Sequence, residues 1–148
     1  MEVQEDFKEL LALLNEHEVE YVIVGAYALA FHGAPRFTGD LDILVHPSRE
    51  NAQKIMSALR DFGFGSVGLS PEDFQKPDYV VQLGVAPVRV DFITSLTGVT
   101  WEEADAGKVN GTYGDVPVSF LGREQLVANK RALGRKRDLA DLEAIGGE

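Results

Sequence analysis

Two aspartates separated by one residue are the first part of the sequence with recognisable chemistry. Asp40 and Asp42 begin the apolar run DLDILV, which predicts a strand. Because side chains alternate along a strand, both carboxylates project from the same face. Two carboxylates so close together repel each other and are costly to desolvate unless a cation lies between them. The spacing indicates a site for a divalent cation, and the alternative is the solvated face of an edge strand.

A glycine at the end of an earlier apolar run lies beside these carboxylates. Residues 21–24 (YVIV) predict a buried strand that leads directly into Gly25 and Ala26, where a short helix begins. Such a turn leaves free backbone N–H groups at the start of the helix, where a phosphate can dock. Gly25 could also serve close packing of the helix on the strand. Carboxylates for a metal ion next to a phosphate cradle suggest a nucleotide site.

A third aspartate lies in the middle of the apolar run VRVDFI. Burying Asp91 there is costly unless the charge is paired or bound to a metal. If its strand lies beside the strand of Asp40 and Asp42, three carboxylates converge and can hold two Mg²⁺ ions about 4 Å apart. The alternative for Asp91 is a structural ion pair with Arg89 or Arg36.

A basic segment near the end of the chain complements these carboxylates. Lys130 lies one turn before a helix break at Gly134, and Arg135 follows the break. Both could reach a triphosphate, one as a point charge and the other as a planar fork. Asp138 and Asp141 share one helix face and could orient either cation through salt bridges. A solvated helix face is the alternative for this segment.

Composition limits the classes of protein that fit. The 148 residues, 45% of them hydrophobic, predict a single folded domain over 1–148, and the absence of Cys excludes disulfides and thiolate metal sites. No apolar run approaches the roughly 18 residues that span a bilayer, so we expect a cytoplasmic protein without a membrane partner. The net charge of −10 with one local basic segment fits a small anionic ligand better than a long polyanion.

The hydrophobic pattern alternates between helical and strand periods. We expect helices over residues 5–17, 26–31, 49–62, 101–106, 123–133 and 137–145, and strands over residues 21–24, 40–45, 79–85, 88–93, 109–112 and 116–120. Residues 65–78 are expected to form a mobile loop near the site, with a helical turn after Ser70-Pro71. The expected class is α/β (α+β), with a mixed, twisted sheet of about four or five strands and helices mainly on one side.

The segment VGAYALAFHGAPRFTGDLDILV resembles the signature of the DNA polymerase beta-type nucleotidyltransferase superfamily. That signature is an apolar residue, Gly, then Gly or Ser, a spacer, and Asp, apolar, Asp or Glu, apolar. Here it reads as residues 24–26, a spacer of thirteen residues and residues 40–43. Asp91 stands where the superfamily has its third carboxylate. Ala26 departs from the signature and offers a phosphate only its backbone N–H.

Two further stretches are similar to one branch of this superfamily. They are the string R-x-T-x-D-x-D, with Arg36 and Thr38, and the ending NKRALGRKRDLADLEAI. The branch comprises small bacterial nucleotidyltransferase-like proteins related to AbiEii toxins and minimal nucleotidyltransferases. The resemblance covers residues 5–145 and implies a minimal nucleotidyltransferase fold. It also implies a toxin–antitoxin setting, with either a homodimer or a toxin or antitoxin partner.

The activity implied by the resemblance is transfer of a nucleoside monophosphate from an NTP, such as ATP, to an acceptor hydroxyl on a protein, a tRNA or a small molecule. Asp40, Asp42 and Asp91 would be the catalytic residues and would hold two Mg²⁺ or Mn²⁺ ions. The nucleotide-binding residues would be Gly25, Ala26, Arg36, Thr38, Lys130 and Arg135. The rival hypothesis is a non-catalytic nucleotide-binding or partner-binding module with a degenerate nucleotidyltransferase fold, which Ala26 favours and the three carboxylates disfavour.

The sequence does not assign a second site to the aromatic and histidine residues. Three aromatic side chains are candidates for stacking on a base, and nothing selects among them: Trp101, Tyr27 and Tyr113. The histidines lack the mutual spacing of metal ligands and are expected to be structural: His17, His32 and His46.

Overall fold

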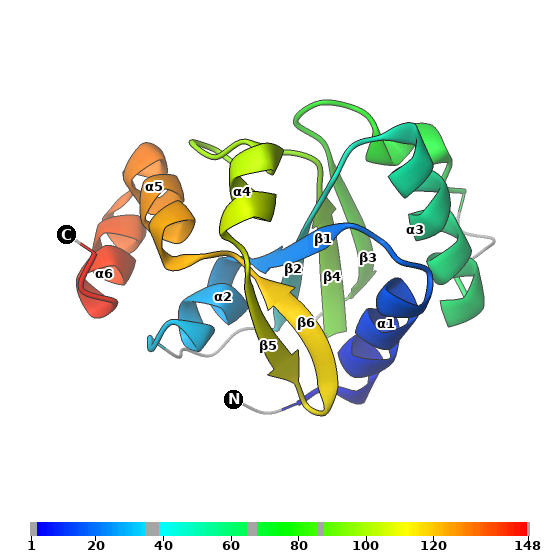
Figure 1. The fold of residues 1–148 in the computed structure, drawn as a ribbon, viewed down its shortest axis with the longest axis horizontal. Helices are drawn as coiled ribbons and strands as arrows, with labels where there is room; N and C mark the ends of the chain where they lie inside the picture. The colour runs from blue at the N-terminus through cyan, green and yellow to red at the C-terminus, as the bar shows by residue number, and fades with distance from the viewer. Residues whose placement is uncertain (1–2, 35–38, 65–67, 86–87, 148) are drawn as a thin grey trace.

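Six strands in the described part of the chain form one mixed sheet, in the order β3-β4-β2-β1-β6-β5 (Figure 1). The computed structural model describes residues 3–34, 39–64, 68–85 and 88–147. The strands are β1 (Tyr21–Val24), β2 (Asp40–Val45), β3 (Val80–Val85), β4 (Val88–Ile93), β5 (Val109–Tyr113) and β6 (Val116–Phe120). Parallel pairing joins β2 to β4 and β1 to β6, and the other pairs are antiparallel. The predicted mixed α/β class is confirmed, with more strands than the four or five expected.

The helices lie close to their predicted positions. They are α1 (Glu5–Glu16), α2 (Gly25–Phe31), α3 (Arg49–Phe62), α4 (Trp101–Gly107), α5 (Arg123–Leu133) and α6 (Lys136–Ala144), with a 3-10 turn, η1, at Pro71–Phe74. Local signals set these limits, as at α3, where the Ser48 side chain accepts a hydrogen bond from the N–H of Asn51 and Gly63 ends the helix at φ 108°. None of the helices in the described ranges has the length and apolar character needed to cross a membrane.

The two faces of the central strands have opposite characters. Leu41 and Ile43 of β2, with Phe92 of β4, are fully buried in the hydrophobic core. Helices α1 and α3 pack against each other beside these strands (Figure 1). Because side chains alternate, Asp40 and Asp42 project from the other face of β2. One face therefore builds the core, and the other is left for polar groups.

The stretch expected to form a loop near the site belongs instead to the core side. Its predicted helical turn is present as η1, and its Phe74 is fully buried with its ring edge-on to Phe92, at 5.8 Å between ring centroids. The turn also contacts α3. Of the predicted stretch 65–78, residues 65–67 lie outside the described residues, and residues 68–78 do not line the cleft described below. Burial of one phenylalanine thus draws this segment away from the carboxylates.

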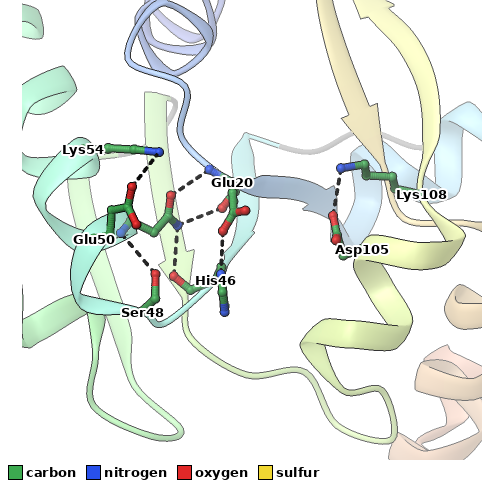
Figure 2. A network of polar contacts seen from close by, with 8 residues as sticks. Glu20, His46, Ser48, Glu50, Lys54, Asp105 and Lys108 are labelled. Atoms are coloured by element: carbon green, nitrogen blue, oxygen red, sulfur yellow. Dashed lines mark hydrogen bonds and ion pairs between the residues drawn. The ribbon is translucent and has the colours of Figure 1, made fainter.

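A buried asparagine joins the ends of β1 and β2. Asn51, only 2% exposed, accepts a hydrogen bond from the N–H of Glu20 at 2.7 Å and donates to the carbonyls of Glu20 and His46, each at 2.9 Å. Figure 2 shows Glu20, His46 and Ser48 gathered around this network. Buried backbone groups need such partners, so one side chain fixes how the two strands leave the sheet.

Replacing Asn51 with Ala should lower the free energy of unfolding by about 2 kcal/mol, because the backbone of Glu20 and His46 loses three hydrogen bonds to a buried side chain. Urea denaturation followed by circular dichroism measures the change. Asn110→Ala on exposed β5 is the matched control and should change stability by less than about 0.5 kcal/mol. Equal effects of the two substitutions would contradict the role given to Asn51.

Candidate functional site

Asp42 and Asp91 lie opposite each other on adjacent parallel strands. The register of β2 and β4 aligns Asp42 with Asp91 and Asp40 with Arg89. Residues aligned in this way share one face of the sheet, so all four side chains project together. The condition stated for three converging carboxylates, that the strand of Asp91 lie beside the strand of Asp40 and Asp42, is met.

Gly25 lets the carboxylate of Asp42 lie against the backbone. Val24, the last residue of β1, pairs with Asp42, and Gly25 follows at φ +67°, a conformation that favours glycine. A Cβ added to Gly25 would lie 2.3 Å from Oδ2 of Asp42. Any larger residue would therefore strain the turn and displace this carboxylate. Gly25 thus allows close packing at this turn, and the group packed against it is the carboxylate of Asp42.

A cleft of about 940 Å³ opens above these side chains. Its lining includes the carboxylates of Asp40, Asp42 and Asp91, the start of α2 at Gly25 and Ala26, and the cations Lys130, Arg135 and Arg137. Cavities of this size bind nucleotide-sized ligands. Acidic and basic groups from distant parts of the chain thus share one cavity.

Arg89 bridges two of the three carboxylates. Its Nη2 lies 2.7 Å from Oδ2 of Asp40 and 3.2 Å from Oδ2 of Asp91. The structure therefore contains the ion pair between Asp91 and Arg89 that was the alternative to a metal site. Arg36, the other partner considered, lies outside the described residues. The pairing is incomplete, however, because Nε of Arg89 and Oδ1 of Asp91 are buried without a hydrogen-bond partner among the described residues. Such orphaned polar atoms are uncommon and call for a physical reason.

One guanidinium does not balance the negative charge of this cluster. Burial, together with the charges of Asp91 and Asp40, raises the pKa of Asp42 to about 6, against the opposing effects of Arg89 and Lys130. Burial also raises the pKa of Asp91, although Arg89 counteracts the shift. Among the described residues, the site thus holds more negative charge than its cations neutralise.

The carboxylate oxygens of the site fit a hard divalent cation, provided that Arg89 moves away from them. All donors are carboxylate oxygens, which Mg²⁺ prefers, and Oδ1 of Asp91 is a buried acceptor without a partner in the described residues. Across the described ranges, no three His, Cys, Asp or Glu side chains already converge as a finished metal site. Arg89 instead holds oxygens of Asp40 and Asp91. A metal ion that binds through Oδ2 of Asp40 or Asp91 would have to displace Arg89 from that oxygen.

The basic part of the cleft is fixed by two aspartates of α6. Lys130 is only 6% exposed, and its Nζ lies 2.9 Å from Asp141 and 3.4 Å from Asp138. Arg135 donates to both oxygens of Asp138, through Nε at 2.6 Å and Nη2 at 3.2 Å. The hydrogen bond from Arg135 lowers the pKa of Asp138 to about 2. The predicted salt bridges from Asp138 and Asp141 to these cations are confirmed.

Other predicted contacts fall outside the cleft or outside the described residues. Arg36 and Thr38 belong to residues 35–38, which the structure does not describe. Tyr27 packs in the core, with its ring centroid 5.7 Å from that of Tyr113, and Trp101 stacks on His46 at 5.1 Å. Among the described residues, those that line the cleft include no aromatic side chain. None of the three stacking candidates therefore reaches the cavity.

Several cleft residues were not singled out from the sequence. Gln82 of β3 lies opposite Asp91, and strand alternation could have found it once the β3–β4 hairpin was assumed. Asn129 donates to the carbonyl of Thr97 at 2.9 Å and so ties the loop after β4 to α5. Arg137 follows Arg135 in the basic segment and also lines the cavity. Only long-range pairing distinguishes these residues from ordinary surface polar groups.

The fold is similar to that of a solved structure from Thermotoga maritima, the crystal structure of a "putative nucleotidyltransferase (TM1012)". The two share 20% sequence identity at a TM-score of 0.59, over 94% of this chain and 89% of that chain. No protein-family profile matches the chain, and neither does any curated protein. The similarity supports a nucleotidyltransferase-like fold, as the sequence predicted, while the narrower AbiEii-related branch stays a prediction.

Replacing Asp42 with Asn should stabilise the metal-free protein at pH 7.5 by about 1–2 kcal/mol, because an ionised buried carboxylate is removed from beside two others. The folded-state pKa of Asp42, about 6, exceeds the ordinary 3.8, so its protonated form favours the folded state. The stability that protonated Asp42 contributes to the wild type is fully present below about pH 4 and is lost as the pH rises through about 6. The gain should therefore be larger at pH 7.5 than at pH 4.

Urea denaturation at both pH values, with chelator present, measures this difference. Glu9→Gln on α1 provides a control that removes one exposed negative charge away from the cleft. A destabilised Asp42→Asn protein at pH 7.5 would show that the ionised carboxylate is well compensated in the wild type.

Proposed function

We propose that this protein is an Mg²⁺-dependent nucleotidyltransferase that moves a nucleoside monophosphate from an NTP to an acceptor hydroxyl. The observation that carries the proposal is the register of β2 against β4, which sets Asp42 beside Asp91 in a cleft that Lys130 and Arg135 also line. Carboxylates that share a cleft with fixed cations suit a metal-bound polyphosphate. The nucleotidyltransferase-like fold supports the same class of reaction.

Asp40, Asp42 and Asp91 would hold the metal, as two Mg²⁺ ions or two Mn²⁺ ions. When bound, the ions activate the attacking oxygen and neutralise charge on the triphosphate and the leaving group. The donors are oxygen atoms alone, which favours Mg²⁺ or Mn²⁺ over zinc or copper. Oδ1 of Asp91, which has no hydrogen-bond partner among the described residues, and the close approach of Asp42 to Gly25 support this assignment.

Backbone and cationic groups of the cleft would bind the triphosphate. N–H groups at Gly25 and Ala26, where α2 begins, would bind the β- and γ-phosphates. Lys130 and Arg135 would neutralise charge as pyrophosphate leaves, and their ion pairs with Asp138 and Asp141 fix them in place beforehand. We assign Arg36 and Thr38 to the same nucleotide, on the strength of the family resemblance.

The transfer step exchanges one bond at the α-phosphorus for another. The acceptor oxygen forms a bond to the α-phosphorus while the bond to the bridging oxygen of the β-phosphate breaks, and pyrophosphate departs. Asp91 would take the proton of the acceptor hydroxyl, for which a carboxyl with a raised pKa is suited. Positioning and charge compensation supply most of the rate enhancement in such reactions.

The acceptor belongs to one of three classes: a protein, a tRNA or a small molecule. The net charge of −10 favours a protein or a small molecule over tRNA, because a polyanion is repelled by most of the surface. A toxin–antitoxin setting, with a second copy or a toxin or antitoxin partner, follows from the family resemblance.

The rival function is a binding module without catalysis. Two observations favour it: Ala26 replaces the Gly or Ser of the signature, and Arg89 forms ion pairs with two of the carboxylates. A module of this kind would bind nucleotide, or a partner, whether or not Mg²⁺ was present. Metal dependence therefore separates the two functions.

Calorimetric titration of the four NTPs, with Mg²⁺ and with chelator, provides the test. The enzyme hypothesis predicts that at least one NTP binds wild type tenfold or more tightly with Mg²⁺, by about 1.4 kcal/mol or more. The Asp40→Asn/Asp42→Asn protein should lose this metal-dependent part, because two of the three proposed ligands become neutral amides.

The charge-matched control is Glu9→Gln/Glu16→Gln, which removes two exposed carboxylates from α1. It should bind as wild type does. Nucleotide binding that is indifferent to Mg²⁺ and to the cleft substitutions would support the binding module, and absence of any nucleotide binding would point to a partner-binding role.

A further inference from the structure

Arg89 lies where a cation is needed between two carboxylates. A single nitrogen, Nη2, contacts Oδ2 of both Asp40 and Asp91. The register of β2 and β4 explains this position, because Arg89 is aligned with Asp40 and is two residues from Asp91 on the same face. The guanidinium is thus an internal counter-ion of the proposed metal site, supplied by the strand that carries Asp91.

This counter-ion leaves the site incompletely paired. Oδ1 of Asp91 and Nε of Arg89 are both buried and lack hydrogen-bond partners among the described residues, although Asp91 is only 9% exposed. A guanidinium has five N–H donors in a fixed fork and could have satisfied Asp91 with two parallel bonds. Its position between two acids therefore leaves one buried acceptor on Asp91 without a partner in the described part of the chain.

Arg89 and a metal ion would approach the carboxylates from different directions. Asp40, Asp42 and Asp91 line the cleft, whereas Arg89 is absent from its lining. The Arg89 side chain is 34% exposed, so it has access to solvent outside the cavity. An ion that enters from the cleft would therefore meet the carboxylates without first meeting Arg89.

We propose that Arg89 competes with the metal: it bridges Asp40 and Asp91 when the site is free of metal and releases at least one of them when a divalent cation binds. The inference rests on the proposed function, since it concerns the same carboxylates. It assigns Arg89 a role in setting the cation affinity of the site.

Competition of this kind couples metal binding to nucleotide binding. A free cation must displace Arg89 unaided, so its affinity for the protein alone is low. A cation that arrives with a triphosphate gains further contacts through the phosphates, and the nucleotide adds negative charge that offsets the displaced guanidinium. The site then fills in the presence of substrate and stays closed to bare ions.

The test is Mn²⁺ binding to the full chain without nucleotide, measured by electron paramagnetic resonance of free Mn²⁺ for wild type and Arg89→Gln. The variant should bind Mn²⁺ about tenfold more tightly, and its melting temperature should be lower than that of wild type without metal but rise further when Mn²⁺ is added. Arg60→Gln on exposed α3 is the matched control and should bind Mn²⁺ as wild type does.

Arg89→Lys keeps the charge but loses the fork, and it covers the case in which Arg89→Gln does not fold. Its Mn²⁺ affinity should exceed that of wild type, because a lysine is a single point charge and holds the two acids less firmly. If the folded Arg89 variants bind Mn²⁺ as wild type does or more weakly, while wild type still binds Mn²⁺–NTP, the competition between Arg89 and the metal is wrong but the proposed function stands. Absence of Mn²⁺ binding by every protein, with and without NTP, would overturn the proposed function as well.

Discussion

The charge on one face of β2 and β4 is the constraint on which the rest of the site depends. Parallel pairing aligns Asp42 with Asp91, and the turn at Gly25 holds the carboxylate of Asp42 against the backbone. Arg89 supplies one positive charge, so the cluster keeps an excess of negative charge among the described residues, and burial together with Asp91 and Asp40 raises the pKa of Asp42 to about 6. A folded chain retains such an arrangement where a ligand completes it, and we propose a divalent cation for this role.

The cations of α5 and α6 are balanced in a different way. Lys130 is buried, which is tolerable because Asp138 and Asp141 surround its ammonium group. Asp138 also holds Arg135, so these four side chains are neutral as a group. The donors of Lys130 and Arg135 would still meet the charge of the departing pyrophosphate locally, in an orientation that the ion pairs fix in advance. Arg137 also lines the cleft and adds a further positive charge.

Local patterns predicted most elements, and long-range pairing decided the site. The sequence named Arg89 as a possible ion-pair partner of Asp91, but only the register of β2 against β4 reveals that Arg89 also contacts Asp40. Periodicity carries no information about which strands become neighbours. The loop before β3 was misplaced for the same reason, since burial of Phe74 against Phe92 depends on a partner distant in sequence.

The most direct test of the central claim, that these carboxylates form a metal–nucleotide site, is a crystal structure with Mn²⁺ and a non-hydrolysable NTP. Anomalous scattering locates Mn²⁺ independently of the refined coordinates. The predicted result is a peak within about 2.3 Å of oxygens of both Asp42 and Asp91, with Arg89 withdrawn from at least one carboxylate. Nucleotide in the cleft with no Mn²⁺ at these oxygens, and Arg89 still bridging Asp40 and Asp91, would contradict it.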